Sequence, residues 1–449
     1  MLWRQANFRV FIALVVLHPL AARAQDSQYW NQQYGPVAEL VGGVVVGSSR
    51  DLSATFYNPG ALALTREPTL LASVQSFEGA WLRAETTPPL VDFKDSNLRP
   101  SPSLFAFALP RNWTGSHTLA FSSLTRQDFD MRVDNWQVLP SRQGGAESLF
   151  EQNLTENWFG VSWARPAGER LGAGVTTYVV YRGQRARKEI SGEVAVSPSQ
   201  GGAGLLVEDF DYWNYRLVWK AGISTQRNSW DLGLTVTTAS VNLFGSGSAS
   251  YVRSAVGADL GAGPVVEVSV QHQDGLASTY RSPWSVAAGA GYRLGPHTFH
   301  GTAEWFSSVS GFEVLDTSSF APDPAAANLV KRLHQQAKSV FNFGLGYERK
   351  ISDRSSFYTA FTTDYTFADE NDSAGNSLST WNIYHATAGA SLTIKNMKLT
   401  MGGAYSFGSD TRSITTLIVP PSGAPVLTPV PLDVKYRRIR MLVGFDFGH

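Results

Sequence analysis

The stretch 213–224 reads WNYRLVWKAGIS, and its residues alternate between two sets. The apolar set comprises Trp213, Tyr215, Leu217, Trp219, Ala221 and Ile223, and the interleaved set comprises Asn214, Arg216, Lys220 and Ser224 with Val218 and Gly222. Successive side chains of a β-strand point to opposite faces, so this alternation predicts a strand with one apolar, aromatic face and one polar face. The same period of two recurs in 341–348, 357–365 and 438–447.

The composition of the polar face indicates which kind of β-protein this is. In a soluble β-sandwich the aromatic side chains face inward and the outward face is rich in Lys and Glu. Here the polar positions hold mainly Gly, Ser, Thr and Asn with a few charges, which suits the lining of a narrow lumen. We therefore expect an all-β fold, a transmembrane barrel whose apolar face contacts lipid.

Similar segments along the chain predict fourteen antiparallel strands. Their ranges are 69–83, 101–110, 116–126, 152–164, 169–182, 210–225, 229–241, 283–293, 297–309, 339–350, 355–367, 380–394, 397–408 and 434–447. Tight turns are expected at 111–115, 165–168, 226–228, 294–296, 351–354 and 395–396, and every other connection is expected to be a long loop. Short turns that alternate with long loops are typical of outer-membrane barrels, with the turns and both termini on the periplasmic side.

Two long connections leave alternatives open. In the segment 242–282, the apolar runs 251–256 and 265–270 would raise the count to sixteen strands if they entered the membrane as a hairpin. Residues 255–264 are too rich in Gly and Ala to form an aromatic girdle, so we expect the segment to lie outside the membrane. In 310–338 the pair Asp323-Pro324 starts a breaker-free stretch, which predicts a helix over 325–338. Such a helix is either a cap over the barrel mouth or an ordinary surface helix.

The overall composition excludes several classes of function. There are 37 Lys+Arg and 37 Asp+Glu, so the formal net charge is zero and nothing favours binding to nucleic acid. Only 16% of residues are charged, while 41 Gly, 25 Phe, 16 Tyr and 13 Trp fit many short strands and turns. The absence of Cys excludes disulfides, thiolate metal sites and cysteine nucleophiles.

The chain divides into three parts. Residues 1–24 are typical of a signal peptide, with Arg4 and Arg9 before a short apolar run and Ala22-Arg23-Ala24 as the cleavage motif. Residues 25–68 are too short for a domain and too apolar for a free tail, so we expect them to form a hatch that plugs the lumen. Residues 69–449 are the predicted barrel.

The hatch carries a resemblance to a known family. Its sequence ends in Asp51-x-Ser53-Ala54-x-Phe56-Tyr57-Asn58-Pro59-Gly60-Ala61-Leu62-Ala63, and with fourteen strands behind it the chain resembles the FadL family of outer-membrane transport proteins. That family includes carriers of long-chain fatty acids and of aromatic hydrocarbons. The resemblance implies a hatch-plugged barrel whose hydrophobic ligands are captured at external loops and pass through the wall into the membrane. Two departures are the family's Asn-Pro-Ala, which reads Asn58-Pro59-Gly60 here, and the end Phe447-Gly448-His449, which would weaken recognition by the barrel-assembly machinery.

Charged residues on the lumen face are the candidate site. The inward cations are Arg216, Lys220, Lys398, Arg438 and Arg440, and the inward acids are Asp231, Glu304, Glu348, Asp364 and Asp446. We expect structural ion pairs for Lys220 with Asp231 and for Lys398 with Asp446. Arg216 and Arg440 lie farther from the turns, so they are the candidates to bind a fatty-acid carboxylate with two N–H groups. Apolar candidates for the ligand's tail are Leu329, Val330 and Leu333 in the predicted helix and Phe56 and Tyr57 in the hatch.

The sequence contains no catalytic or metal-binding motif, so we expect no enzyme activity and no cofactor. His300 and Glu304 lie on the lumen face of one strand but lack a nucleophile, so a hydrogen bond is the expected role. The functional prediction is passive uptake of a hydrophobic small molecule across the outer membrane by a monomer in contact with membrane lipids, with the hatch shifting around Asn58-Pro59-Gly60 on binding. The alternatives are a structural or adhesion barrel with a closed lumen, and an outer-membrane lipase.

Overall fold

The computed structural model describes residues 27–65, 70–86, 92–98, 101–138, 144–197, 200–259, 264–317, 333–368, 381–418 and 426–447. The short helices are α1 (Pro36–Leu40), α2 (Ala54–Tyr57), η1 (Pro59–Leu64) and α3 (Arg111–Thr114). The strands are β1 (Leu70–Thr86), β2 (Asp92–Leu98), β3 (Ser101–Ala108), β4 (Thr118–Val138), β5 (Gly144–Pro166), β6 (Leu171–Ser197), β7 (Gln200–Arg227), β8 (Trp230–Thr237), β9 (Val241–Asp259), β10 (Pro264–Ala277), β11 (Ser285–Leu294), β12 (His297–Phe306), β13 (Val309–Glu313), β14 (His334–Ala337), β15 (Val340–Lys350), β16 (Ser355–Asp364), β17 (Ile383–Ile394), β18 (Met397–Ile418) and β19 (Val426–Phe447). Among the described helices, none is long and apolar enough to cross a membrane.

The wall is a closed antiparallel barrel of fourteen strands, as the sequence predicts. The sheet has seventeen segments because three wall strands are each divided in two: β2 with β3, β8 with β9, and β10 with β11. The wall closes where β19 pairs with β1, from Leu70 opposite Phe447 at the end of the barrel that carries the short turns. The six tight turns predicted from the sequence lie at this end.

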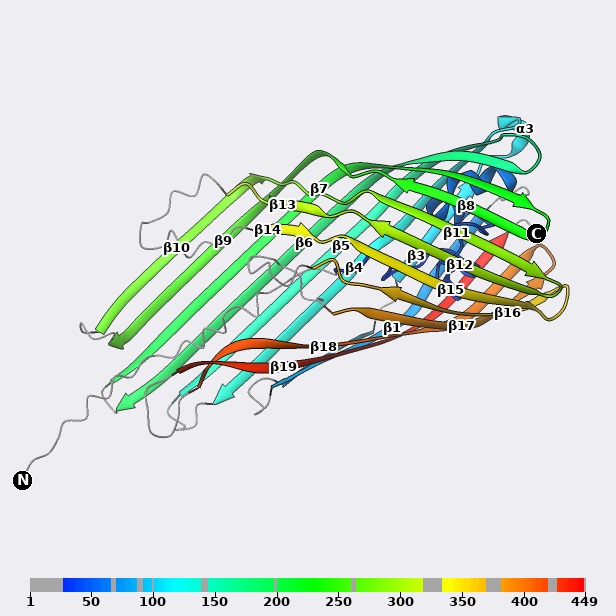
Figure 1. Cartoon of the computed structure of the whole chain (residues 1–449). Coiled ribbons are helices and arrows are strands. Elements are labelled where there is room, and N and C mark those ends of the chain that lie inside the picture. Colours follow the sequence, from blue (N-terminus) through cyan, green and yellow to red (C-terminus); the bar gives the residue numbers. More distant parts are fainter. Residues whose placement is uncertain are drawn as a thin grey trace, which may run out of the picture.

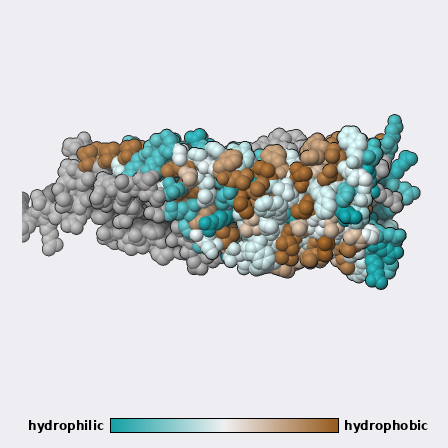
Figure 2. Space-filling model, turned by 90° about the horizontal axis from the view of Figure 1, so that it is seen from above, coloured by the Kyte–Doolittle hydropathy of each residue, from teal (hydrophilic) through white to brown (hydrophobic). Residues whose placement is uncertain are grey.

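The two faces of the wall differ as the alternation predicts. In β15 the side chains of Phe341, Phe343 and Leu345 are 53%, 44% and 69% exposed, whereas Asn342 between them is fully buried. Figure 2 shows hydrophobic residues gathered over the outer face and hydrophilic ones at the end that carries the short turns. The aromatic side chains therefore face outward, which is the reverse of a soluble sandwich.

The strands are longer than predicted at the end opposite the turns. β4 and β5 stay paired as far as Val138 opposite Gly145, and β6 and β7 as far as Ser197 opposite Gln200. The expected long loops are thus wrong at these places, because an antiparallel ladder that leaves the lipid still pairs its backbone N–H and C=O groups. Figure 1 shows β4, β5, β6 and β7 extending far beyond β11, β12 and β15.

The structure also bears on the two long connections, 242–282 and 310–338, for which the sequence left alternatives. The segment 242–282 adds no wall strand, because β9 and β10 continue the lines of β8 and β11. Of the helix predicted over 325–338, the part 325–332 lies outside the described residues, with Leu329 and Val330. The prediction is wrong for 334–337, which form β14 and pair with β13, since strand pairing satisfies the backbone there.

Candidate functional site

The N-terminal segment, which we define as residues 27–65, lies inside the lumen near the short turns. It packs against wall glycines at which a Cβ atom would clash with its backbone or side chains: Gly172, Gly174, Gly222, Gly233, Gly289, Gly344, Gly389, Gly402 and Gly444. These glycines, which we call the glycine seat, belong to β6, β7, β8, β11, β15, β17, β18 and β19. Absence of a side chain lets two backbones approach closely, so the seat follows the N-terminal segment around most of the wall.

The Asn58-Pro59-Gly60 motif fixes this segment to the wall. Asn58 is fully buried, and its Nδ2 donates to the carbonyl oxygens of Val46 (2.8 Å) and Ile223 (2.9 Å). Its Oδ1 accepts from the backbone N–H of Gly60 at 3.1 Å, which caps η1. A Cβ on Gly60 would lie 2.6 Å from the carbonyl oxygen of Gly222. Gly60 is therefore explained by its close approach to the wall.

Polar contacts with the wall hold the segment along its first part, from Trp30 to Arg50. Trp30 donates its backbone N–H to Asp364 (2.9 Å) and its Nε1–H to Glu304 (2.8 Å). Arg50 forms an ion pair with the buried Asp231 at 2.5 Å. Between them, the carboxylate of Glu39 accepts from Ser73 and Ser103, and its burial raises its pKa to about 7.

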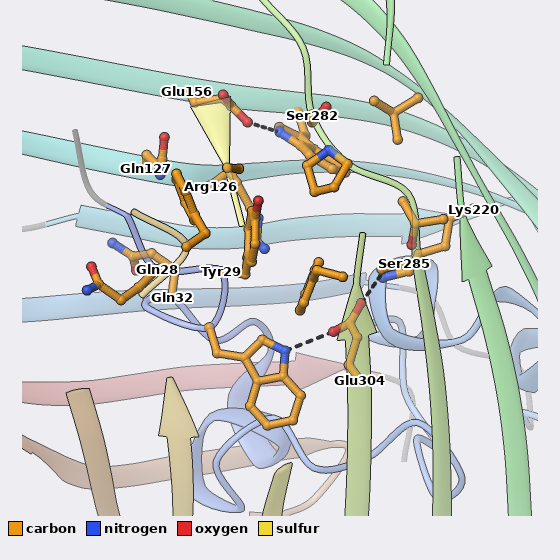
Figure 3. Close-up of a pocket in the computed structure, with 18 of the residues that line it drawn as sticks. Gln28, Tyr29, Gln32, Arg126, Gln127, Glu156, Lys220, Ser282, Ser285 and Glu304 are labelled. Atoms are coloured by element: carbon orange, nitrogen blue, oxygen red, sulfur yellow. Dashed lines mark hydrogen bonds between the residues drawn. The ribbon is translucent and has the colours of Figure 1, made fainter. Parts of the chain in front are cut away.

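Above the segment, on the side away from the turns, lies a cavity of about 90 Å³ (Figure 3). Its aromatic lining includes Tyr29, Trp30, Phe56, Tyr57, Trp158, Tyr280, Phe306, Phe312 and Phe367. Its charged lining is Arg126, Glu156, Lys220, Arg281 and Glu304, and Figure 3 draws four of these around Tyr29. Phe56 and Tyr57, two of the apolar candidates named from the sequence, are among these lining residues. An enclosed aromatic lining with a few charged groups is the usual character of a small-molecule site.

Lys220 and Arg126 project into this cavity from β7 and β4. The structure does not pair Lys220 with Asp231, because the register sets Asp231 opposite Gln226, six residues from Lys220 and nearer the turn. Asp231 instead binds Arg50 and Arg293, while the Nζ of Lys220 lies 4.1 Å from the centre of the Phe56 ring. Arg126 donates to the hydroxyl of Tyr34 at 3.4 Å, and its guanidinium carbon lies 5.4 Å from the centre of the Phe56 ring.

A charged cluster borders the cavity. Glu156 accepts ion pairs from Arg182 (2.9 Å) and Arg216 (2.7 Å), and both arginine side chains are fully buried. The guanidinium carbons of Arg182 and Arg216 lie 4.0 and 4.4 Å from the centre of the Tyr280 ring. Tyr280 belongs to the segment between β10 and β11, which bends inward, and its hydroxyl accepts from Gln335 at 3.0 Å. Arg216 is therefore held in an ion pair, and it does not line the cavity.

The other predicted residues lie apart from the cavity. Arg440 is buried and donates to Gln32 at 3.4 Å, and Arg438 donates to the carbonyl oxygen of Asn31 at 2.9 Å. Lys398 and Asp446 face each other across β18 and β19, and the Nζ of Lys398 lies 5.9 Å from the Tyr358 ring. Leu333 packs in a buried apolar cluster with Tyr212, Leu276, Tyr280, Phe312, Val314 and Leu315.

The histidine signal has a structural explanation. His300 does not bond Glu304; its Nδ1 lies 2.7 Å from Ser48 Oγ, and its Nε2 lies 3.9 Å from Glu348. His300, Ser48 and Glu348 do not line the cavity. Within the described ranges, no group of three or more His, Asp or Glu could hold a metal ion.

Reasoning from the sequence missed Arg126, Glu156, Arg182 and Tyr280. The alternation of buried Ser122 and Leu124 points Arg126 inward, so the pattern held that signal. A register shift at Thr125/Gln127 then brings Gln127 to the cavity as well. The inward position of Tyr280 could not be predicted from the alternation pattern, because Tyr280 lies between strands β10 and β11.

Solved structures of similar shape share this architecture. A Pseudomonas aeruginosa FadL homologue matches with a TM-score of 0.60 at 11% identity, over 94% of this chain and 99% of that one. The P. putida toluene transporter TodX matches with a TM-score of 0.58 at 11% identity, over 93% and 99% of the two chains. The fold is that of the FadL-type proteins.

A third match with the same fold is the Ralstonia pickettii toluene transporter TbuX, with a TM-score of 0.55 and 13% identity over 93% of this chain and 98% of that one. No family model matches the sequence, and no curated protein matches it. The FadL-type likeness is thus one of fold over nearly the whole chain.

Proposed function

We propose that this protein is an outer-membrane channel for the passive uptake of a hydrophobic small molecule. The observation that carries the proposal is the aromatic cavity enclosed within a barrel whose outer face is apolar. A hydrophobic compound partitions into hydrocarbon but is held back by a polar outer leaflet, so a protein path past that layer is useful. The path requires no cofactor and no bond chemistry, and the N-terminal segment acts as the hatch that prevents free diffusion of solutes.

The size of the cavity favours a small ligand over a long-chain fatty acid. A cavity of about 90 Å³ is well below the roughly 300–1,000 Å³ of sites for drug-sized ligands. It is nearer to the roughly 150 Å³ of an engineered apolar cavity that binds benzene. Phe312 lines this cavity and also belongs to the buried apolar cluster that contains Leu333, and we assign that cluster to initial capture.

The ladder next to the cavity supports a lateral exit. The pairing of β8 with β11 ends at Thr237 opposite Ser285, and that of β9 with β10 begins again at Ser246 opposite Ala277. Between these points, side-chain atoms replace part of the ladder: Tyr280 N–H donates to Asn242 Oδ1, and Ser282 N–H donates to Ser240 Oγ, both at 2.9 Å. Thr238 and Ser282 line the cavity. We call this interrupted stretch, 238–245 with 278–284, the seam, and we place the lateral exit there.

The test is uptake of radiolabelled toluene and oleate by Gram-negative cells with and without the protein. Toluene should accumulate several-fold faster in cells that carry it, and oleate should show a smaller difference. If cells with and without the protein take up each compound at the same rate, the result would favour the alternative, a structural or adhesion barrel with a closed lumen. An esterase assay on the purified protein tests the lipase alternative, for which we expect no activity above that of the detergent blank.

A further inference from the structure

The cavity contains two cations that form no ion pair with a carboxylate among the described residues. Lys220 is only 5% exposed, and in the described part of the chain its Nζ has no ion pair or hydrogen bond; it lies over the face of Phe56. Arg126 also has no ion pair among the described residues, and its contacts are the Tyr34 hydroxyl and the rings of Phe56 and Trp158. A buried cation without a partner is unfavourable, because it has lost its hydration.

The acids of the cavity are already occupied. Glu156 accepts from Arg182, Arg216 and the Nε1–H of Trp158 (2.7 Å). Glu304 accepts from Trp30 (2.8 Å) and from the Ser285 hydroxyl (2.7 Å). Among the described residues, the lining therefore holds three cations, Arg126, Lys220 and the exposed Arg281, against the two acids Glu156 and Glu304. Glu156 is also shared with Arg182 and Arg216. A ligand with one negative charge would reduce this excess.

The remaining lining favours a flat ring. Tyr29 stacks on Phe306 and Phe367, with ring centres 4.2 and 4.6 Å apart. Phe56 presents one face to Lys220 and contacts Trp158 edge to face at 6.2 Å. Aromatic rings of a ligand gain from such offset and edge contacts, and a cavity of about 90 Å³ favours a ligand of about one ring.

We propose that the cavity selects a monocyclic aromatic carboxylate, held with its carboxylate between Lys220 and Arg126 and its ring among Tyr29, Phe56 and Trp158. This inference rests on the proposed function and narrows its substrate class. Charge-assisted hydrogen bonds from an ammonium and a guanidinium are stronger than neutral ones. The ionised form of the acid binds, so its affinity falls once the pH drops below the acid's own pKa.

The test compares three ligands that share one ring and differ in charge: sodium benzoate, toluene and benzylamine. Binding to the purified full-length protein in detergent is measured by calorimetry. Benzoate should bind at least tenfold more tightly than benzylamine, and Lys220→Met should remove most of this preference. The matched control Lys350→Met removes an exposed cation at the end of β15 and should change neither affinity.

The outcomes separate the two proposals. Equal affinity for benzoate and benzylamine, or an unchanged preference in both Lys220→Met and Arg126→Gln, would overturn the charge selection while leaving uptake of a neutral ring intact. Failure of all three ligands to bind, with no uptake in cells, would overturn the proposed function itself. Heat-dependent gel mobility verifies that each variant forms a barrel, and Arg126→Gln supplies the result if Lys220→Met does not fold.

Discussion

The lumen has two regions of opposite construction, the glycine seat near the turns and the cavity above it. In the seat, wall glycines let the N-terminal segment approach until backbone meets backbone, as at Gly289, whose Cβ would lie 2.7 Å from the N atom of Gly47. In the cavity, the wall instead presents long side chains such as Arg126, Lys220 and Trp158, with space between them. The difference supports our proposal that one segment performs two tasks: its glycine-packed part closes the lumen, and its aromatic part, Tyr29, Trp30 and Phe56, lines the proposed binding site.

Removing the segment should erase the difference between the two regions. Deletion of residues 25–63 is expected to convert the barrel into an open, ion-conducting pore, because nothing else described fills the seat. Planar-bilayer recordings should show a conductance at least tenfold above that of the full-length protein. A deletion variant that forms a barrel by gel mobility and still conducts like the full chain would contradict the hatch.

Locking the seam should block the cavity without touching the seat. Since the natural chain has no Cys, the pair Ser240→Cys and Ser282→Cys gives one defined disulfide between neighbouring residues. Uptake by the oxidised protein should fall to the level of cells without it and recover on reduction. The pair Leu234→Cys and Ala288→Cys, which lie opposite each other on β8 and β11, is the matched control and should not respond. Full uptake through the oxidised seam would place the exit elsewhere.

A single methyl group in the seat should loosen the segment. Gly233→Ala places a Cβ against the carbonyl oxygen of Val46, and overpacking of this kind costs about 1–3 kcal/mol. Thermal unfolding should show the loss, and basal conductance should rise. Gly403→Ala is the control, because the nearest atom to its Cβ would be 3.5 Å away. Equal melting temperatures for the two variants would argue against tight docking.

The smallest effect is expected from Glu39, beneath the cavity. Burial raises its pKa from 4.5 to about 7, so the protonated acid fits the docked segment better than the carboxylate. Docking is then strongest below about pH 4.5 and weakens as the pH rises towards 7 and above. Glu39→Gln mimics the protonated acid and should raise the melting temperature by about 1–3 °C at pH 8, with no gain at pH 4. A gain of the same size at both pH values would contradict a buried, titrating Glu39.

The sequence predicts some features of the barrel wall better than others, and the reasons are physical. The strand positions were predictable because a period of two must place Phe341 and Phe343 on one face and Asn342 on the other. Strand length was not, because polar alternation in β6 and β7 beyond the membrane resembles loop composition. The sequence motif singles out Asn58. Its hydrogen bond to the carbonyl oxygen of Ile223 could not be predicted, because that bond depends on how two distant segments pack together.

The cavity was predicted less well than the wall. Alternation correctly places Arg216, Lys220 and Arg440 inward, yet it gives no height along the barrel and no partners. Arg216, which we expected to bind a ligand, forms an ion pair with Glu156. Lys220, which we expected in an ion pair, lines the cavity instead. Only the register and the inward bend at Tyr280 decide between those roles.

Two neighbouring alanines of β11 test directly whether the apolar faces of the strands point outward to lipid. Ala287 is buried and lines the cavity, whereas Ala288 is exposed on the outer face. Nitroxide labels on Ala287→Cys and Ala288→Cys in lipid vesicles report collisions with oxygen, which concentrates in hydrocarbon, and with a water-soluble nickel chelate. We predict frequent oxygen collisions and few nickel collisions at 288, and a much lower oxygen signal at 287. Higher oxygen accessibility at 287 than at 288, or strong nickel collisions at 288, would contradict a barrel whose apolar face meets lipid.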